Sequence, residues 1–330
     1  MHSRGSVVVV GSYVQDHAWL CDVFPQVGET RRATGFNTGP GGKGFNQAIA
    51  CRRQGVDTVF IGAIGADALG KAARDFADAE QLDARWQMCS DAPTASSSIV
   101  VNAHGENLIV VNLAANEWLD PEFVRAQLAG IDAPRVLLCQ LENNLDAIAA
   151  ALDAASDPDC LRVLNPAPMH SELNLGLLRR VDVLTPNETE FSLMSKCCGF
   201  DDVDADAIAQ LSDNELHALV RRLPLGSSAS STCVITLGAH GCFVSHGEKR
   251  HGDVQAYYRI AAESVTAIDS TGAGDAFSGA LAAGLVEFSN APFADIVQHA
   301  NRVAAMSTET IGTAPAMPTR VQVEARFGCD

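Results

Sequence analysis

The segment with the clearest potential for chemistry covers residues 269–280, with the sequence DSTGAGDAFSGA. Its small residues Gly272, Ala273 and Gly274 allow successive backbone N–H groups to point into one concavity, and a helix beginning near Asp275 would add its positive N-terminal end. A carboxylate beside such an anion hole can take a proton from an attacking hydroxyl group. The structural alternative is an Asp N-cap with glycine turn chemistry. The length of the motif favours the catalytic interpretation.

A second glycine-rich segment, GGKGFNQA at residues 41–48, also precedes a predicted helix. Its glycines allow close approach of the backbone to a ligand, and the amides of Asn46 and Gln47 can hydrogen-bond the hydroxyl groups of a polyol. Asp16, just beyond the first predicted strand, is a candidate acceptor for neighbouring hydroxyls, although a surface turn would also accommodate it. These residue types together indicate a sugar-binding segment.

A third polar segment, TPNETE, directly follows the predicted strand 181–184. Ligands of open α/β sheets bind beyond the carboxyl ends of the strands. Glu190 could orient Mg²⁺-bound water there, and Asn187 could contact a phosphate oxygen. A helix start with Thr185 as N-cap and Pro186 at the first helical position is the structural alternative, and both interpretations can hold at once.

The elements that must position these segments alternate between strands and helices. The β-branched run Val7–Val10 is typical of a strand buried on both faces, and it is followed by a helix at 45–54 and a strand at 58–62. The pattern predicts an α/β fold with a doubly wound, mostly parallel sheet flanked by helices. Further strands are predicted at 135–140, 160–164, 181–184 and 233–237, with Ala/Leu-rich helices such as 145–155 between them.

One stretch departs from this alternation. Ser96–Val101 and Asn107–Asn112 are alternating strands that predict a hairpin. Together with the irregular segment 12–36, the hairpin could form a small sheet that covers a binding site as a lid. We therefore predict one α/β domain over residues 1–330, with a lid formed by about 12–36 and 96–113.

Composition excludes several classes of function. The 330-residue chain has a formal net charge of −17, which disfavours nucleic acids and anionic membrane surfaces as partners. No signal-peptide core or long apolar run is present, and ten scattered cysteines without a CxxC pair predict a reduced, cytoplasmic protein without structural zinc. Two motif matches are not interpreted as nucleotide-binding sites. Residues 39–44 fit the dinucleotide-binding motif G-x-G-x-x-G, but they lie about 28 residues beyond the first strand, which disfavours a dehydrogenase. Residues 65–71 fit a P-loop, but Ala72 stands where the Ser or Thr that holds Mg²⁺ is required, which favours a simple loop before a helix.

Taken in order, these motifs resemble the ribokinase-like (phosphofructokinase B-type) carbohydrate kinases. The resemblance extends from Gly11 to Pro318, and its specific segments are GGKGxNQA, the segment NPAP at 165–168, TPNETE and GAGD. It implies transfer of the ATP γ-phosphate to a sugar hydroxymethyl group, with ribose favoured and a nucleoside or another sugar or polyol as the alternative. A non-catalytic sugar-binding module would be expected to lose the base or the anion hole, and both are present.

The resemblance also implies roles for individual residues. Asp275 would be the base beside the anion hole of Gly272, Ala273 and Gly274. The residues that would hold the sugar, beneath the lid, are Asp16, Gly42, Lys43, Asn46, Glu142 and Asp275. Those on the ATP and Mg²⁺ side would be Asn187, Glu190, Thr236, Gly238, Gly241, Gly272, Gly274 and Asn301. Those around a monovalent cation, usually K⁺, would be Asp269, Thr271, Ser307, Thr310 and Gly312.

Members of this family often form homodimers through their lid sheets, and we expect the same here. Two positions depart from the family pattern. Val14 stands where ribokinases usually carry Asn, which removes an amide hydrogen bond to the sugar and favours acceptors other than ribose. Ala316 stands where a Ser near the cation is usual, so that ligand is lost or replaced by water.

Overall fold

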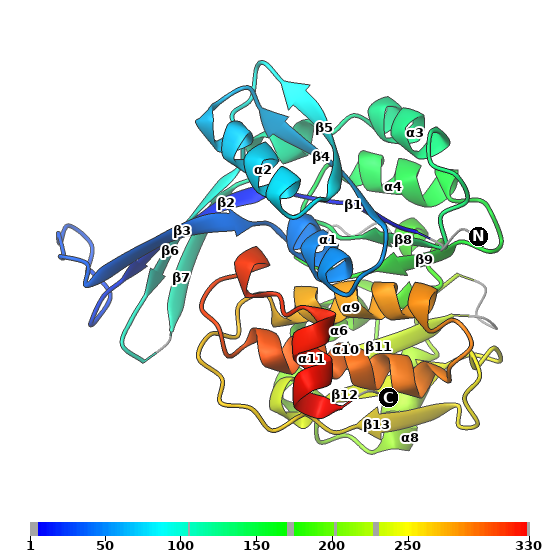
Figure 1. Ribbon diagram of the computed structural model, residues 1–330. Helices are drawn as coiled ribbons and strands as arrows, with labels where there is room; N and C mark the ends of the chain where they lie inside the picture. The colour runs from blue at the N-terminus through cyan, green and yellow to red at the C-terminus, as the bar shows by residue number, and fades with distance from the viewer. Residues whose placement is uncertain (1–5, 105, 170–174, 201–202, 227–230, 329–330) are drawn as a thin grey trace.

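The computed structural model describes residues 6–104, 106–169, 175–200, 203–226 and 231–328, and it consists of a large sheet from which a smaller sheet projects (Figure 1). The large sheet is parallel except for one strand, β12, which runs antiparallel to both of its neighbours. The predicted doubly wound, mostly parallel sheet is confirmed. In spatial order its strands are β13 (Tyr257–Ile260), β12 (Cys242–His246), β11 (Thr232–Thr236), β10 (Val183–Leu184), β9 (Leu161–Leu164), β8 (Val136–Cys139), β1 (Val7–Val10), β4 (Thr58–Gly65) and β5 (Asp83–Cys89).

Helices cover both faces of the large sheet. Because side chains alternate along a strand, Val7 and Val9 of β1 join one apolar core while Val8 and Val10 join the other. The first core is closed by α1 (Lys43–Arg53), α2 (Ala68–Ala79), α9 (Ala273–Glu287), α10 (Phe293–Ser307) and α11 (Arg320–Phe327). The second is closed by α3 (Pro121–Ala129), α4 (Leu145–Ala154), α5 (Leu175–Leu178), α6 (Glu188–Cys197), α7 (Ala205–Ile208) and α8 (Asp213–Val220). Three 3₁₀ turns are η1 (Ala114–Trp118), η2 (Gly238–His240) and η3 (Ala314–Ala316).

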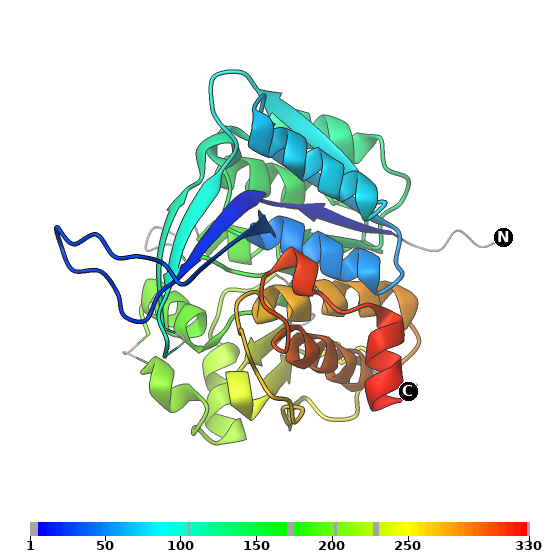
Figure 2. The same cartoon turned by 60° about the vertical axis from the view of Figure 1, so that its left-hand side comes forward.

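The small sheet has the strand order β3 (Gly35–Gly41), β2 (Val14–Leu20), β6 (Ser96–Val101) and β7 (Asn107–Asn112). The predicted hairpin of β6 and β7 is confirmed, but the expectation of an irregular segment over 12–36 is wrong in part. Residues 14–20 form a full strand, and its partner continues to Gly41, so the small sheet leads directly into α1. The loop between β2 and β3 extends away from the body of the molecule (Figure 2).

The two helices that follow the glycine-rich segments, α1 and α9, pack closely against each other. A Cβ atom added to Gly279 of α9 would lie only 2.5 Å from the carbonyl oxygen of Gln47 in α1, so glycine is required for this approach. The contact brings the first turns of both helices together at the carboxyl ends of the parallel strands, where α/β sheets bind ligands.

The nine cysteines in the described part of the chain are all free thiols. Within the same residues, no helix has the length and apolar character needed to cross a membrane. No group of three or more His, Cys, Asp or Glu side chains is arranged there to hold a metal ion. Any cation bound by the described residues must therefore rely on other oxygen donors as well.

Candidate active site

A cavity of about 130 Å³ lies beyond the carboxyl ends of β9, β10 and β11. Seven of its lining residues were predicted as site residues, namely Lys43, Asn187, Glu190, Thr236, Gly272, Gly274 and Asp275. Three others, Asn165, Ala167 and Thr185, had not been predicted as site residues. Their signal in the sequence was their position directly after β9 and β10, the place where such sheets bind ligands.

Asp275, in the first turn of α9, is held by two amide side chains from α1. Asn46 Nδ2 donates to Asp275 Oδ2 at 2.9 Å, and Gln47 Nε2 donates to Asp275 Oδ1 at 2.9 Å. The carboxyl group is nearly buried but borders the cavity. Donors on both oxygens fix the orientation of the carboxyl group toward the cavity, and a general base must be held in such a fixed position.

Further amide side chains hold Gln47 in turn. Gln47 Nε2 also donates to Asn165 Oδ1 at 3.1 Å, and Gln47 Oε1 accepts from Gln140 Nε2 at 2.5 Å. Asn165 Nδ2 donates to the carbonyl oxygen of Thr185 at 2.8 Å. Asn46 Oδ1, in contrast, is buried without a hydrogen-bond partner among the described residues. The network fixes Gln47 more firmly than Asn46.

The predicted anion hole lies at the N-terminus of α9. Gly272 is the N-cap with φ +79°, a conformation that favours glycine, so the alternative with Asp275 as N-cap is wrong. The amide of Ala273 donates to the carbonyl oxygen of Ser270 at 3.2 Å. The amides of Gly272, Gly274 and Asp275 have no acceptor within the described chain. These three N–H groups are therefore free to donate hydrogen bonds to a bound anion.

Lys43 is the first residue of α1. Among the described residues that line the cavity, it is the only basic one. Burial alone would lower the pKa of Lys43, but the carboxylates of Asp275, Glu142 and Glu190 raise it above its ordinary value. Glu142 Oε2 accepts from the Lys43 backbone N–H at 2.9 Å and from Ser12 Oγ at 2.6 Å. A carboxyl group, unbonded amides and a lysine side chain share one cavity, a combination suited to phosphoryl transfer.

Asp16 lies on β2 of the small sheet. Ser97 Oγ donates to Asp16 Oδ1 at 2.6 Å, and Thr313 Oγ1 lies 3.3 Å from Asp16 Oδ2. Burial is the main cause that raises the pKa of Asp16, and the nearby carboxylates add to it. Gly42 has φ +88°, and a Cβ there would lie 2.6 Å from the backbone nitrogen of Val14. Sequence reasoning had not identified Ser97 or Thr313.

Asn187 and Glu190 form a capping box at the start of α6. Glu190 N–H donates to Asn187 Oδ1 at 2.8 Å, and Asn187 N–H donates to Glu190 Oε2 at 2.9 Å. The prediction of Thr185 as N-cap is therefore wrong: its hydroxyl instead hydrogen-bonds Ser278 Oγ at 3.1 Å. Burial is the main cause that raises the pKa of Glu190.

The other residues predicted to contact the nucleotide separate into two groups. Thr236 lines the cavity, whereas Gly238, Gly241 and Asn301 are not among its lining residues. A Cβ at Gly241 would lie 2.0 Å from a carbonyl oxygen of segment 260–262, and Asn301 Nδ2 donates to another carbonyl of that segment at 2.7 Å. Gly241 and Asn301 thus hold the segment that follows β13.

The residues predicted around a monovalent cation lie on two adjacent segments. Asp269 joins them, because its carboxylate accepts the N–H groups of Thr271 at 2.9 Å and of Gly312 at 3.0 Å. Ser307 Oγ donates to a carbonyl oxygen within α10, and Thr310 N–H approaches the Ser307 carbonyl oxygen at 3.4 Å. Since the Asp269 carboxylate already accepts two N–H groups, backbone carbonyl oxygens are the donors that best fit a cation here.

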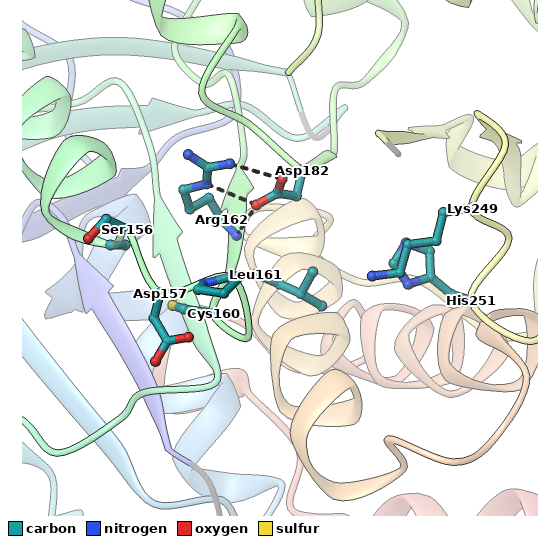
Figure 3. A pocket seen from close by; sticks show the side chains of 10 residues that line it. Ser156, Asp157, Cys160, Leu161, Arg162, Asp182, Lys249 and His251 are labelled. Atoms are coloured by element: carbon teal, nitrogen blue, oxygen red, sulfur yellow. Dashed lines mark hydrogen bonds and ion pairs between the residues drawn. The ribbon is translucent and has the colours of Figure 1, made fainter. Parts of the chain in front are cut away.

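A second cavity, of about 170 Å³, lies at the opposite, amino-terminal edge of the sheet (Figure 3). Arg162 and Asp182 form an ion pair on its wall with an N–O distance of 2.9 Å. Cys160, Lys249 and His251 also line this cavity, and none of the predicted site residues does. Its position away from the carboxyl ends of the strands favours the first cavity as the candidate active site.

Comparison with known proteins agrees with this geometry. Residues 4–320 match the pfkB family of carbohydrate kinases. The ribokinase of Mus musculus is 31% identical, covering 95% of this chain and 92% of its own length, and that of Haemophilus influenzae is 33% identical, covering 96% of each. A deoxyribokinase of Salmonella typhi is 26% identical over 84% of each chain.

Solved structures show the same fold. The ribokinase of Giardia lamblia superimposes with a TM-score of 0.84 at 27% identity, covering 98% of this chain and 99% of its own. The ribokinase of Arabidopsis thaliana, solved with ribose and ATP, gives a TM-score of 0.78 at 25% identity and 99% coverage of both. This chain therefore belongs to the pfkB family of carbohydrate kinases and is an ATP-dependent enzyme of that family.

Proposed function

We propose that this enzyme transfers the γ-phosphate of ATP to the hydroxymethyl group of ribose, forming ribose 5-phosphate. The observation that carries the proposal is the position of Asp275, which is held by Asn46 and Gln47 beside three unbonded amides in one cavity. Ribokinases similar over nearly the whole chain support the choice of ribose.

In the proposed reaction, Asp275 accepts the proton of the sugar hydroxymethyl group as its oxygen attacks the γ-phosphorus. The bond between that phosphorus and the ADP oxygen breaks, and ADP leaves. The amides of Gly272 and Gly274 stabilise the charge on the transferring phosphoryl group, and Lys43 neutralises part of it. Asp16, Gly42, Asn46 and Glu142 orient the sugar.

Two cations fit the proposed chemistry. Glu190 would hold Mg²⁺ through water, because both of its oxygens already accept hydrogen bonds from Asn187. Carbonyl groups around Asp269, Thr271 and Gly312 would hold K⁺. When bound, these ions neutralise charge on the phosphates and near the anion hole.

A second acceptor class is favoured by Val14. This residue is buried on β2, and it lies on the same face as Asp16 because alternate residues of a strand share a face. An apolar side chain there offers no hydrogen bond to a hydroxyl group. The alternative acceptor is therefore a sugar without a hydroxyl at that position, such as 2-deoxyribose, or a nucleoside.

A coupled assay of ADP release tests the acceptor. We expect the highest kcat/KM with ribose in a panel that also contains 2-deoxyribose, fructose and nucleosides. A preference of about tenfold or more for 2-deoxyribose or a nucleoside would favour the second class. If no compound of the panel stimulates ADP release, the proposed function is wrong.

The substitution Asp16→Asn should raise the KM for the sugar about 100-fold, since two charge-assisted hydrogen bonds to hydroxyls are weakened. Stability should not fall, because an amide can still accept from Ser97 and donate to Thr313 Oγ1. The raised pKa of Asp16 means that its ionised form opposes folding. This cost is present above the folded-state pKa and vanishes below the unfolded value of about 3.9.

Thermal unfolding of the Asp16→Asn variant and the parent enzyme checks this sign. The variant should have an equal or higher Tm at neutral pH, and the difference should vanish in acid. The exposed Asp91 provides a matched control, and Asp91→Asn should change neither the KM nor the Tm. If the KM for the sugar is unchanged in Asp16→Asn, Asp16 does not bind the sugar.

We further propose that the small sheet acts as a lid and joins two copies in a homodimer. Cross-strand neighbours Phe36, Trp19, Val100 and Leu108 form an apolar row across all four strands, on the face opposite to Asp16. Trp19, Phe36 and Leu108 are large, exposed side chains. Such a patch is typical of a surface that another protein covers.

The substitution Leu108→Glu tests the dimer by light scattering. We expect the parent enzyme to have the mass of a dimer and the variant that of a monomer, because a buried charge without a partner opposes association. Leu193→Glu, at a similarly exposed leucine on α6, should remain dimeric. A monomeric parent enzyme, or a dimeric Leu108→Glu, would contradict the proposed interface.

We propose a cytoplasmic location, which the free thiols of the described cysteines support, since reducing compartments keep thiols unpaired. The proposed partners are ATP, a small sugar and a second copy of the chain. The net charge of −17 argues against nucleic acids and anionic membranes as further partners.

A further inference from the structure

Thr313 contacts the sugar-binding carboxylate from the opposite end of the chain. Its hydroxyl oxygen lies 3.3 Å from Asp16 Oδ2 and 3.1 Å from the carbonyl oxygen of Pro40. The single hydroxyl hydrogen is shared between these two acceptors, and the negative charge favours Asp16. Thr313 is 8% exposed, so little water competes for the contact.

The segment that carries Thr313 is anchored on its N-terminal side by Asp269. The carboxylate of Asp269 accepts the N–H of Gly312 at 3.0 Å and that of Thr271 at 2.9 Å. Thr271 directly precedes Gly272, the N-cap of α9. The same carboxylate therefore connects the Thr313 segment to the anion hole.

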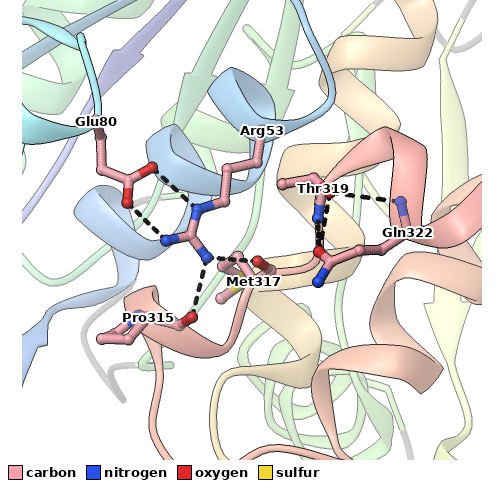
Figure 4. A network of polar contacts seen from close by, with 6 residues as sticks. All are labelled: Arg53, Glu80, Pro315, Met317, Thr319 and Gln322. Carbon is pink, nitrogen blue, oxygen red and sulfur yellow. Dashed lines mark hydrogen bonds and ion pairs between the residues drawn. The ribbon is translucent and has the colours of Figure 1, made fainter.

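On its C-terminal side, the segment is anchored by the end of α1 (Figure 4). Arg53 Nη1 donates to the carbonyl oxygens of Pro315 at 2.9 Å and Met317 at 2.6 Å, while Glu80 pairs with the other side of the guanidinium. Gln54 Nε2 donates to the carbonyl oxygen of Pro318 at 2.9 Å. Anchors on both sides hold the Thr313 hydroxyl in place against Asp16.

We propose that Thr313 is a positioning residue that orients the Asp16 carboxylate for the acceptor sugar. The inference rests on the proposed function, in which Asp16 binds the sugar. Ser97 holds the other oxygen of the same carboxylate, so two hydroxyls from distant segments fix its plane. Glu142 and Asp275 also face Asp16 with like charge, which makes donors on its oxygens more important.

The substitution Thr313→Val tests the proposal, because valine keeps the methyl group and removes the hydroxyl. We expect the KM for the sugar to rise about tenfold, with kcat and the KM for ATP within about twofold of the parent values. Loss of the donor should raise the pKa of Asp16, so the acid limb of the kcat/KM profile for the sugar should move to higher pH. Thr313→Ser, which retains the hydroxyl, should restore both properties.

Calorimetric titration with ribose gives a readout that does not depend on turnover. The dissociation constant for ribose should rise about tenfold in Thr313→Val. Thr313→Ala provides a second variant if valine impairs folding. If the parent enzyme phosphorylates ribose and Thr313→Val has the same KM for the sugar and the same acid limb, the inference about Thr313 is wrong but the proposed function still holds. A serine variant as impaired as the valine variant would also overturn it. A parent enzyme without transfer to any acceptor would instead refute the proposed function.

Discussion

Asp275→Asn should lower kcat by about 10²–10⁴-fold while ATP and sugar still bind, because the variant lacks the general base and keeps the shape of the site. The hydrogen bonds make this variant structurally feasible. Asn46 Oδ1 has no partner among the described residues, so the Asn46 amide can rotate and accept from the new amide at position 275. Steady-state kinetics together with calorimetric titration of ATP separate turnover from binding.

The control for this prediction is Asp91→Asn, which changes the same functional group at an exposed position. Its kcat should equal that of the parent enzyme. If Asp275→Asn retained near-parental kcat, Asp275 would not be the base. A loss of ATP binding in parallel with kcat would instead assign the effect to the architecture of the site.

Gly274→Ala should affect activity and stability in opposite directions. A Cβ atom at Gly274 meets no described atom within 4 Å, and the residue lies in the first turn of a helix, where alanine is favoured over glycine. The Tm should therefore be unchanged or higher, and the free energy of unfolding should rise by up to about 1 kcal/mol. The new methyl group would point into the cavity that the transferring phosphoryl group needs, and we expect kcat to fall about 100-fold or more.

Kinetics and thermal unfolding of Gly274→Ala check both parts. Gly130→Ala is the matched control, since Gly130 caps α3 at negative φ and its added Cβ would meet its closest neighbour at 3.6 Å. The control should keep full activity. A Gly274→Ala enzyme with parental kcat would show that the open space at this glycine does not hold the phosphoryl group.

Much of the large sheet could be predicted because its strands are buried on both faces and read as β-branched or apolar runs, as at Val7–Val10. The small sheet was harder. Strand β3 has the sequence GFNTGPG, and three glycines and a proline give little local preference for a strand. It is an edge strand, where proline is tolerated, and only pairing with β2 makes it extended.

The same distinction applies to the site. The glycine-rich motifs identified Asp275 and its helix from local chemistry. That both Asn46 and Gln47 donate to this carboxylate depends on the packing of α1 against α9, which no local pattern encodes. The prediction of Thr185 as N-cap was wrong because Asn187, two residues later, and Glu190 satisfy each other's backbone N–H groups in a capping box.

The strongly acidic composition gains a specific meaning from the position of Lys43. Against a net charge of −17, this one ammonium group lines the cavity with Glu190 and Asp275. The proposed mechanism therefore depends on Lys43, unbonded amides and bound cations to balance the charge of ATP.

Product analysis by ³¹P NMR tests the central claim most directly. With ATP, Mg²⁺, K⁺ and ribose, we predict that ADP and a new phosphate monoester appear in equal amounts. Its phosphorus signal should be split into a triplet by the two protons of a hydroxymethyl carbon. A doublet from phosphate on a secondary or anomeric hydroxyl, or release of inorganic phosphate alone, would contradict the account.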